Sequence, residues 1–247
     1  KGLEYLKLAV AQNLGEAQYN MATLYEQGIE IPKNVPKAIY YYKLAANNNI
    51  AQAQYSLGWK YYNGRFVKKD IDKATYFYKL AVQNGHIQAH TNLGLIYDRS
   101  DDPKKHKEAI KLYEFASNYD SESAIYNLAL KYEKGKGVEK NLSKSIELLS
   151  KASKLGHAPS QYNLGWMYKN GYGIKQNYQE AVRLYSLAAD QGDEFAEYNL
   201  ALLYEKGEGV KKDLKKAIDL YTSSSEKDFA KAQYNLGLIY KNKNGTE

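Results

Sequence analysis

AQYNLG is the sequence of residues 232–237, and hexapeptides of the same kind occur along the whole chain. They read AQYNMA from Ala17, AQYSLG from Ala53, AHTNLG from Ala89, AIYNLA from Ala124, SQYNLG from Ser160 and AEYNLA from Ala196. Successive copies start 36, 36, 35, 36, 36 and 36 residues apart. Self-similarity at a fixed period of this size is typical of repeat proteins. Seven copies in register therefore predict an array of equivalent structural units.

Each copy predicts a pair of helices. In the copy that begins at Ala53, small or apolar residues recur four, five and eight positions later, which is the spacing of one helix face. A loop around Gly64 interrupts this pattern, because glycine adopts turn conformations that other residues resist. Asp70 is then a typical helix N-cap, so a second helix is expected over residues 71–84. The candidate N-caps in other copies are Asn34, Asn141, Asn177 and Asp213.

The predicted second helices all end at the same kind of residue. Glycine, asparagine and aspartate are the residues best suited to a left-handed position at a helix C-terminus. The column consists of Asn13, Asn49, Gly85, Asp120, Gly156, Gly192 and Asp228.

Small residues form the predicted contact between the two helices of a copy. One position of the first helix holds Ala22, Gly58, Gly94, Ala129, Gly165, Ala201 and Gly237. Two positions of the second helix hold Ala38, Ala74, Ala109, Ser145, Ala181 and Ala217, and then Ala45, Ala81, Ala116, Ala152, Ala188 and Ser224. One such pair buries too little surface alone, so the copies must stack. The sequence predicts an all-α solenoid of antiparallel helix pairs.

Composition excludes several other classes of protein. The 247 residues include no Cys, which rules out disulfide scaffolds, thiolate metal sites and cysteine nucleophiles. No apolar run is long enough to span a bilayer, and the start of the chain lacks the pattern of a signal peptide. The formal net charge is +7 and 44% of the residues are hydrophobic, as in folded globular proteins. These features predict no particular compartment.

The chain resembles the Sel-one-like repeat (SLR) family, a relative of the tetratricopeptide repeat (TPR) family. The resemblance rests on the pattern A-x-Y-N-L-G-x-x-Y-x-x-G-x-G-V followed by K-A-x-x-x-Y-x-x-A-A-x-x-G, and it covers the whole chain. It implies a TPR-like right-handed superhelix that acts as an adaptor or scaffold for other proteins. The third copy departs from the pattern, because residues 99–106 replace the glycine loop and are one residue short. We expect a local irregularity in the stack there.

The repeat boundaries predict one solenoid domain over residues 1–247. It begins with a partial leading helix over residues 1–13 and ends with a half repeat over residues 232–247. Full repeats start near Ala17, Ala53, Ala89, Ala124, Ser160 and Ala196. Because the chain opens inside a helix and has no initiator Met, we expect the domain to be an excerpt of a longer array.

The residues predict no catalytic, metal or cofactor site. The Gly-x-Gly elements recur at the repeat period and lack the preceding strand of a dinucleotide-binding loop. His86 and His90 are four residues apart, but no third metal ligand is visible nearby. No Gly-x-Ser-x-Gly nucleophile motif is present. We therefore expect a non-enzymatic protein without a small-molecule substrate.

The aromatic residues of the first helices are the best candidates for a binding site. The resemblance to TPR proteins implies that the side of the first helix opposite Leu57 and Tyr61 lines a concave groove. Both Trp residues fall on this side at equivalent positions, and Trp and Tyr commonly anchor interfaces. The predicted groove residues are Tyr55, Trp59, Tyr62, Tyr126, Glu133, Tyr162, Trp166, Lys169, Tyr198 and Glu205. We expect a protein or peptide partner to bind there.

Two alternatives remain open at the level of sequence. Lysines gather near the loops and the starts of the second helices, so a basic edge could bind nucleic acid or an acidic membrane surface. Acidic residues such as Asp70 and Asp213 lie among these lysines and reduce the positive electrostatic potential of the edge. The chain could also be the regulatory repeat segment of a larger enzyme.

Overall fold

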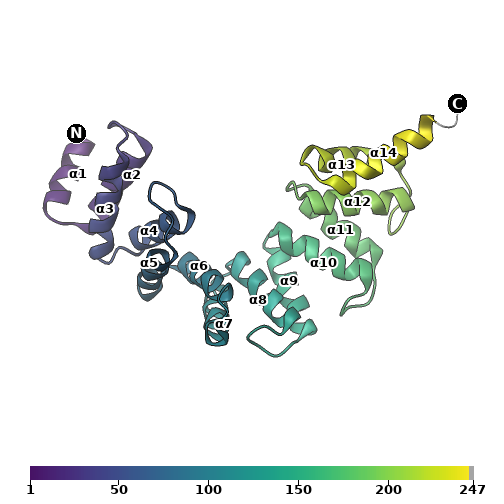
Figure 1. The fold of residues 1–247 in the computed structure, drawn as a ribbon, viewed down its shortest axis with the longest axis horizontal. Helices are drawn as coiled ribbons and strands as arrows, with labels where there is room; N and C mark the ends of the chain where they lie inside the picture. Colours follow the sequence, from purple (N-terminus) through teal and green to yellow (C-terminus); the bar gives the residue numbers. More distant parts are fainter. Residues whose placement is uncertain (245–247) are drawn as a thin grey trace. The chain divides into compact units, whose positions relative to one another are not determined.

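The computed structural model describes residues 1–244, with side chains up to residue 241, as helices joined by short loops (Figure 1). No strand is present in this described part of the chain. The last three residues of the predicted final half repeat lie outside it. The chain divides into two compact units, Lys1–Ser121 and Glu122–Glu247, which are described one at a time. The union of the two units in a single domain and the handedness of the superhelix stay predictions.

The first unit starts with a second-type helix and continues with three helix pairs (Figure 1). Each first helix packs against the second helix of its own repeat, which in turn packs against the next first helix within the unit. The bounds are α1 Gly2–Ala11, α2 Gly15–Gln27, α3 Val35–Asn47, α4 Ala51–Asn63, α5 Ile71–Gln83, α6 Ile87–Asp98 and α7 Pro103–Ser117.

The second unit starts with three helix pairs and ends with a first-type helix. Its bounds are α8 Glu122–Lys134, α9 Leu142–Lys154, α10 Ala158–Asn170, α11 Tyr178–Ala189, α12 Glu194–Lys206, α13 Leu214–Glu226 and α14 Ala230–Asn244.

The helix ends confirm the predicted caps. Asn34, Asp70, Asn141, Asn177 and Asp213 are N-caps, and each side chain accepts a hydrogen bond from the backbone N–H three residues later. This bond satisfies one of the free N–H groups at the start of the helix. Every member of the predicted C-terminal column has a positive φ, from 55° at Asp120 to 99° at Gly156. The same short-range signals therefore set the ends of the second helices in both units.

Close packing of a glycine against a tyrosine joins the two helices of a repeat. A Cβ atom at Gly58 would lie 2.6 Å from the Tyr78 ring, and one at Gly94 would lie 2.6 Å from Tyr113. The same contact in the second unit, between Gly165 and Tyr185, is 3.0 Å. All three tyrosine side chains are fully buried. The second helix of these repeats thus places its largest core side chain, a tyrosine, against the glycine of the first helix.

The third repeat has the expected local irregularity. Its first helix, α6, ends at Arg99 in a right-handed conformation, whereas α2, α4, α10 and α12 end at a left-handed glycine. The next helix is longer than the other second helices of the structure and begins at Pro103 with Asp102 as its cap. The substituted loop therefore changes both helix ends that it joins.

An apolar hollow lies in the third repeat at the place where the first two repeats have a stacked ring. In the first two repeats, Tyr41 and Phe77 stack on Tyr25 and Tyr61 with centroid distances of 5.7 Å. Leu112 occupies this position in the third repeat, beside a cavity of about 260 Å³. Its lining consists of Leu93, Tyr97, Glu108, Lys111 and Leu112.

We expect Leu112→Phe to raise the free energy of unfolding by about 0.5–1.5 kcal/mol, because the new ring would fill the hollow and stack on Tyr97. Urea denaturation followed by circular dichroism measures the change. The control is Phe77→Leu, which should lower stability by a similar amount. A destabilised Leu112→Phe variant would show that the hollow cannot accept a ring.

Candidate partner-binding surface

A small pocket lies between the first helices of the second and third repeats. Trp59, Tyr62 and Asn63 of α4 and Asn92 and Leu95 of α6 line its volume of about 110 Å³. Residues three and four positions apart share one helix face, so each helix presents its lining residues on one side. Trp59 and Tyr62 are two of the predicted groove residues, and Leu95 is the equivalent of Trp59 on α6. We call this site the Trp59 pocket.

Two amide side chains hold the pocket in place. The Nδ2 atom of Asn63 donates to the backbone carbonyl of Trp59 at 2.9 Å. The Nδ2 atom of Asn92 donates to the hydroxyl of Tyr78, on the preceding second helix, at 3.2 Å. Tyr78 is the ring that packs against Gly58. The pocket wall is therefore tied to the core of the repeat.

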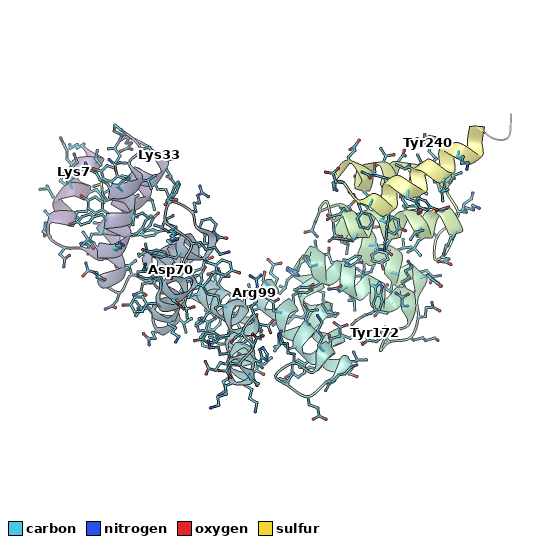
Figure 2. All side chains as sticks on the ribbon, viewed as in Figure 1. Lys7, Lys33, Asp70, Arg99, Tyr172 and Tyr240 are labelled. Atoms are coloured by element: carbon cyan, nitrogen blue, oxygen red, sulfur yellow. The ribbon has the colours of Figure 1, made fainter. Side chains whose placement is uncertain are left out.

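Three exposed cations surround the two rings of the pocket. The guanidinium carbon of Arg65 lies 5.6 Å from the centroid of Trp59. Arg99, labelled at the end of α6 in Figure 2, donates from Nη1 to the Tyr62 hydroxyl. The Nζ atom of Lys69 lies 6.0 Å from the Tyr62 centroid. Within the described residues, none of the three forms an ion pair with a carboxylate.

Tyr55, the third predicted residue on α4, packs inside the repeat. It stacks on His86 with a centroid distance of 4.3 Å, and its ring lies 5.9 Å from that of Tyr78. Burial, and then the charge of His90, lower the pKa of His86. The contact with Tyr78 recurs in other repeats, as between Tyr19 and Tyr42 and between Tyr162 and Tyr185. Tyr55 therefore packs against its own repeat and supports the surface more than it extends it.

The equivalent location in the second unit has a different chemistry. Trp166 and Lys169 of α10 stand where α4 has Trp59 and Tyr62. The Nζ atom of Lys169 donates to Oδ1 of Asn199, the equivalent of Asn92, at 3.0 Å. Burial, and then the nearby Lys206, lower the pKa of Lys169. Here a polar bridge joins the two helices at the place where a ring borders the Trp59 pocket.

Trp166 is exposed, with 40% of its surface accessible, whereas Trp59 is half-buried. Its ring meets Tyr172 edge-to-face at a centroid distance of 5.6 Å, and Figure 2 labels Tyr172 in the loop that follows α10. Trp166 is thus available for contact but lies beside a loop ring instead of a pocket.

The other predicted residues of the second unit are mostly engaged with their neighbours. Tyr126 accepts a hydrogen bond from Asn163 at 2.9 Å, and burial raises its pKa, with Glu133 adding to the rise. Oε2 of Glu205 accepts a hydrogen bond from the Tyr221 hydroxyl at 2.7 Å. The half-buried rings contact other rings, as Tyr162 does with Tyr185 and Phe195 and Tyr198 does with Tyr221 and Phe229.

Sequence reasoning missed the polar and charged members of the pocket. Asn92 is part of the YNLG-type motif, so its recurrence could have suggested a role on the first helix. Arg99 opens the segment that replaces the glycine loop in the third repeat, with Ser100 at the glycine position, and this departure from the pattern was the available signal. Nothing in the repeat pattern marks Arg65 or Lys69 as neighbours of the aromatic rings.

Lysines of the predicted basic edge lie on tyrosine rings of their own repeats. The Nζ atoms of Lys37, Lys73 and Lys216 are 5.3, 5.5 and 4.4 Å from the centroids of Tyr25, Tyr61 and Tyr204, respectively. A lysine over a ring covers the aromatic face while its charge stays near water. These contacts give the edge lysines a structural explanation.

The described residues contain no group of three or more His, Cys, Asp or Glu side chains placed to hold a metal ion. His90 stacks on Phe115 at 4.1 Å, and its Nδ1 atom bonds to the His86 carbonyl. None of the described helices has the length and apolar character needed to cross a membrane.

The Sel1 repeat family matches seven segments of the chain: residues 15–50, 51–86, 87–118, 122–157, 158–193, 195–229 and 230–242. The chain therefore belongs to the Sel1 repeat family. Proteins of this family generally mediate protein–protein interactions and are typically non-catalytic scaffolds.

Solved structures agree with this assignment. A protective antigen of uropathogenic Escherichia coli strains with an SLR fold is 32% identical, with a TM-score of 0.88 over 96% of this chain and 51% of that chain. This chain thus spans about half the length of that protein. A Sel1 repeat protein from Oxalobacter formigenes is 27% identical, with a TM-score of 0.80 over 91% of this chain and 92% of that one.

A third structure shows the fold alone. An immunity protein from Pseudomonas aeruginosa is 20% identical, with a TM-score of 0.54 over 86% of this chain and 81% of that chain. No curated protein sequence matches the chain.

Proposed function

We propose that this chain is a non-catalytic scaffold that binds a protein or peptide partner on the exposed side of its first helices. The observation that carries the proposal is the Trp59 pocket, where two aromatic rings and a leucine from consecutive repeats surround an open volume. Tryptophan and tyrosine dominate binding energy at interfaces when they border a desolvated pocket. The general role of the family in protein interactions supports the same function.

Rigidity is the proposed mechanism of binding. Helices on both sides form the pocket, and Asn92 ties it to the buried Tyr78. A preformed surface loses little conformational entropy when a partner binds, so more of the contact energy appears as affinity. The partner supplies the side chain that fills the pocket.

The test is selection of peptides from a display library of random dodecapeptides on the 247-residue chain. We expect selected peptides to lose affinity for the Trp59→Ala variant by about tenfold or more, as for a hot-spot residue. Tyr40→Ala is the control, because Tyr40 is 58% exposed but lies on the second helix α3. Peptides that bind Trp59→Ala as tightly as the unaltered protein would contradict the proposed site.

A further inference from the structure

The occupant of the Trp59 pocket is defined by the size of the pocket and by the charges around it. Resting on the proposed function, we infer that the pocket selects an acidic, extended peptide segment that inserts one aliphatic side chain. The two parts of this inference depend on separate observations, the lining of the pocket and the unpaired cations beside it.

The residues that line the Trp59 pocket determine which side chain of a peptide can insert into it. Trp59, Tyr62 and Leu95 provide apolar surface around about 110 Å³. An apolar protein cavity of about 150 Å³ accommodates a benzene molecule. The smaller volume here is suited to a branched aliphatic side chain such as valine, leucine or isoleucine. Tryptophan or phenylalanine of a partner would exceed it.

The cations beside the pocket determine the charge of the peptide residues on either side of the inserted side chain. Arg65 lies over Trp59, and Arg99 and Lys69 lie against Tyr62, all within 6.0 Å of a pocket ring. All three are exposed and have no ion-pair partner among the described residues. Guanidinium groups bind carboxylates through paired hydrogen bonds. An extended chain advances about 3.3 Å per residue, so acidic residues within about three positions of the anchor would reach these groups.

Glu26 is a carboxylate close enough to Arg65 for the charge of Arg65 to help lower its pKa, but its hydrogen bonds are to other residues. Glu26 accepts hydrogen bonds from Lys60 and Tyr42, with the shorter contact to each at 2.7 Å. Asp98, which precedes Arg99, is half-buried. Arg65 and Arg99 therefore keep free donors for a partner.

The second unit provides an internal comparison. At its equivalent location Lys169 is half-buried and bonds to Asn199, so a polar bridge replaces Tyr62 as a pocket wall. An aliphatic anchor would gain less apolar contact there. The aliphatic and acidic preference thus belongs to the Trp59 pocket of the first unit.

The experiment compares peptides selected from the random dodecapeptide library on the unaltered chain and on the Arg65→Gln/Arg99→Gln variant. Both side chains are exposed, so circular dichroism of the variant should match that of the unaltered protein. We expect peptides from the unaltered chain to carry one aliphatic residue with Asp or Glu within three positions. The variant should select peptides that keep the aliphatic residue and lose the acidic ones.

A second arm measures affinity for one selected peptide and its substituted forms. Replacing the aliphatic residue with Ala, or the acidic residues with Lys, should weaken binding by about tenfold or more. Trp166→Phe leaves Trp59 as the single tryptophan, so its fluorescence reports occupancy of the pocket directly.

The outcomes separate the two proposals. Selected peptides that depend on Trp59 but carry neutral or basic flanks, or an aromatic anchor, would overturn this inference and leave the proposed function intact. Peptides that bind without Trp59, or failure of the library to yield any binder, would overturn both.

Discussion

Gly58→Ala is expected to lower the free energy of unfolding by about 1–3 kcal/mol, although alanine is normally the better helix former. The new Cβ atom would lie 2.6 Å from Cδ1 and 2.7 Å from Cε1 of Tyr78. Tyr78 is fully buried and accepts a hydrogen bond from Asn92, so its ring has little freedom to move. Gly58→Leu would add further atoms at the same place and should cost more.

The matched control is the same substitution at Gly237, which occupies the equivalent position on α14. Among the described residues, no atom apart from the chain neighbours and the backbone of its own helix lies within 4 Å of a Cβ built at Gly237, so alanine should stabilise its helix by about 0.5–1 kcal/mol. The effect of Gly165→Ala on the free energy of unfolding should lie between those of Gly58→Ala and Gly237→Ala, because a Cβ atom at Gly165 would lie 3.0 Å from the Tyr185 ring. Urea denaturation by circular dichroism, with amide exchange of α4 and α5, measures the series. Equal effects at Gly58 and Gly237 would contradict the close-approach explanation.

The sequence predicted the fold because the repeat places residues of special conformation at fixed intervals. Asp70 and its equivalents cap helices through a bond to a backbone N–H three residues away, so the signal and its effect are both local. The left-handed column also depends on the conformational range of single residues. The family assignment followed from the same pattern.

The roles of the surface aromatics could not be predicted as well, because they depend on contacts between repeats. Tyr126 is held by Asn163, which is 37 residues away, and Tyr55 stacks on His86. A helical stripe shows which side of a helix a residue occupies. It does not show which neighbour covers that residue.

A buried polar ladder between repeats was also invisible in the sequence. Gln54 donates to the Ala46 carbonyl and accepts from Asn84, and Gln161 accepts from Gln191 in the second unit. Each partner lies 30 residues further along the chain, at the end of the second helix. Because glutamine is usually exposed, its burial here follows from the stacking of repeats alone.

Glu26→Ala is expected to destabilise the chain by about 3 kcal/mol, whereas Lys60→Met should cost less than about 1 kcal/mol. The Lys60 side chain is 5% exposed and its Nζ lies 2.7 Å from Glu26, whose side chain is 17% exposed. Loss of the carboxylate leaves a buried ammonium without its partner. Loss of the lysine leaves a carboxylate that water can reach.

The second unit shows why methionine should be tolerated at position 60. Met167 is the equivalent of Lys60 and is buried, and Glu133 is the equivalent of Glu26 and is half-buried. The control Glu133→Ala should therefore change stability by no more than about 1 kcal/mol. The double variant Glu26→Ala/Lys60→Met should have about the same free energy of unfolding as Lys60→Met. If the two single effects simply add in the double variant, the ion pair is not the cause.

The same pair predicts how the effect changes with pH. Burial by itself would raise the pKa of Glu26, but the hydrogen bonds from Lys60 and Tyr42 and the charges of Lys60 and Arg65 hold it below the ordinary value. A carboxyl with a lowered pKa in the folded state stabilises the protein above its unfolded pKa, about 4.3, and loses this contribution as pH falls through the folded pKa. The stability difference between the unaltered chain and Glu26→Ala should be constant from about pH 6 to 8 and narrow in acid. Urea denaturation across this range measures it, and a difference that stays constant below about pH 4 would exclude an ionised Glu26 as its source.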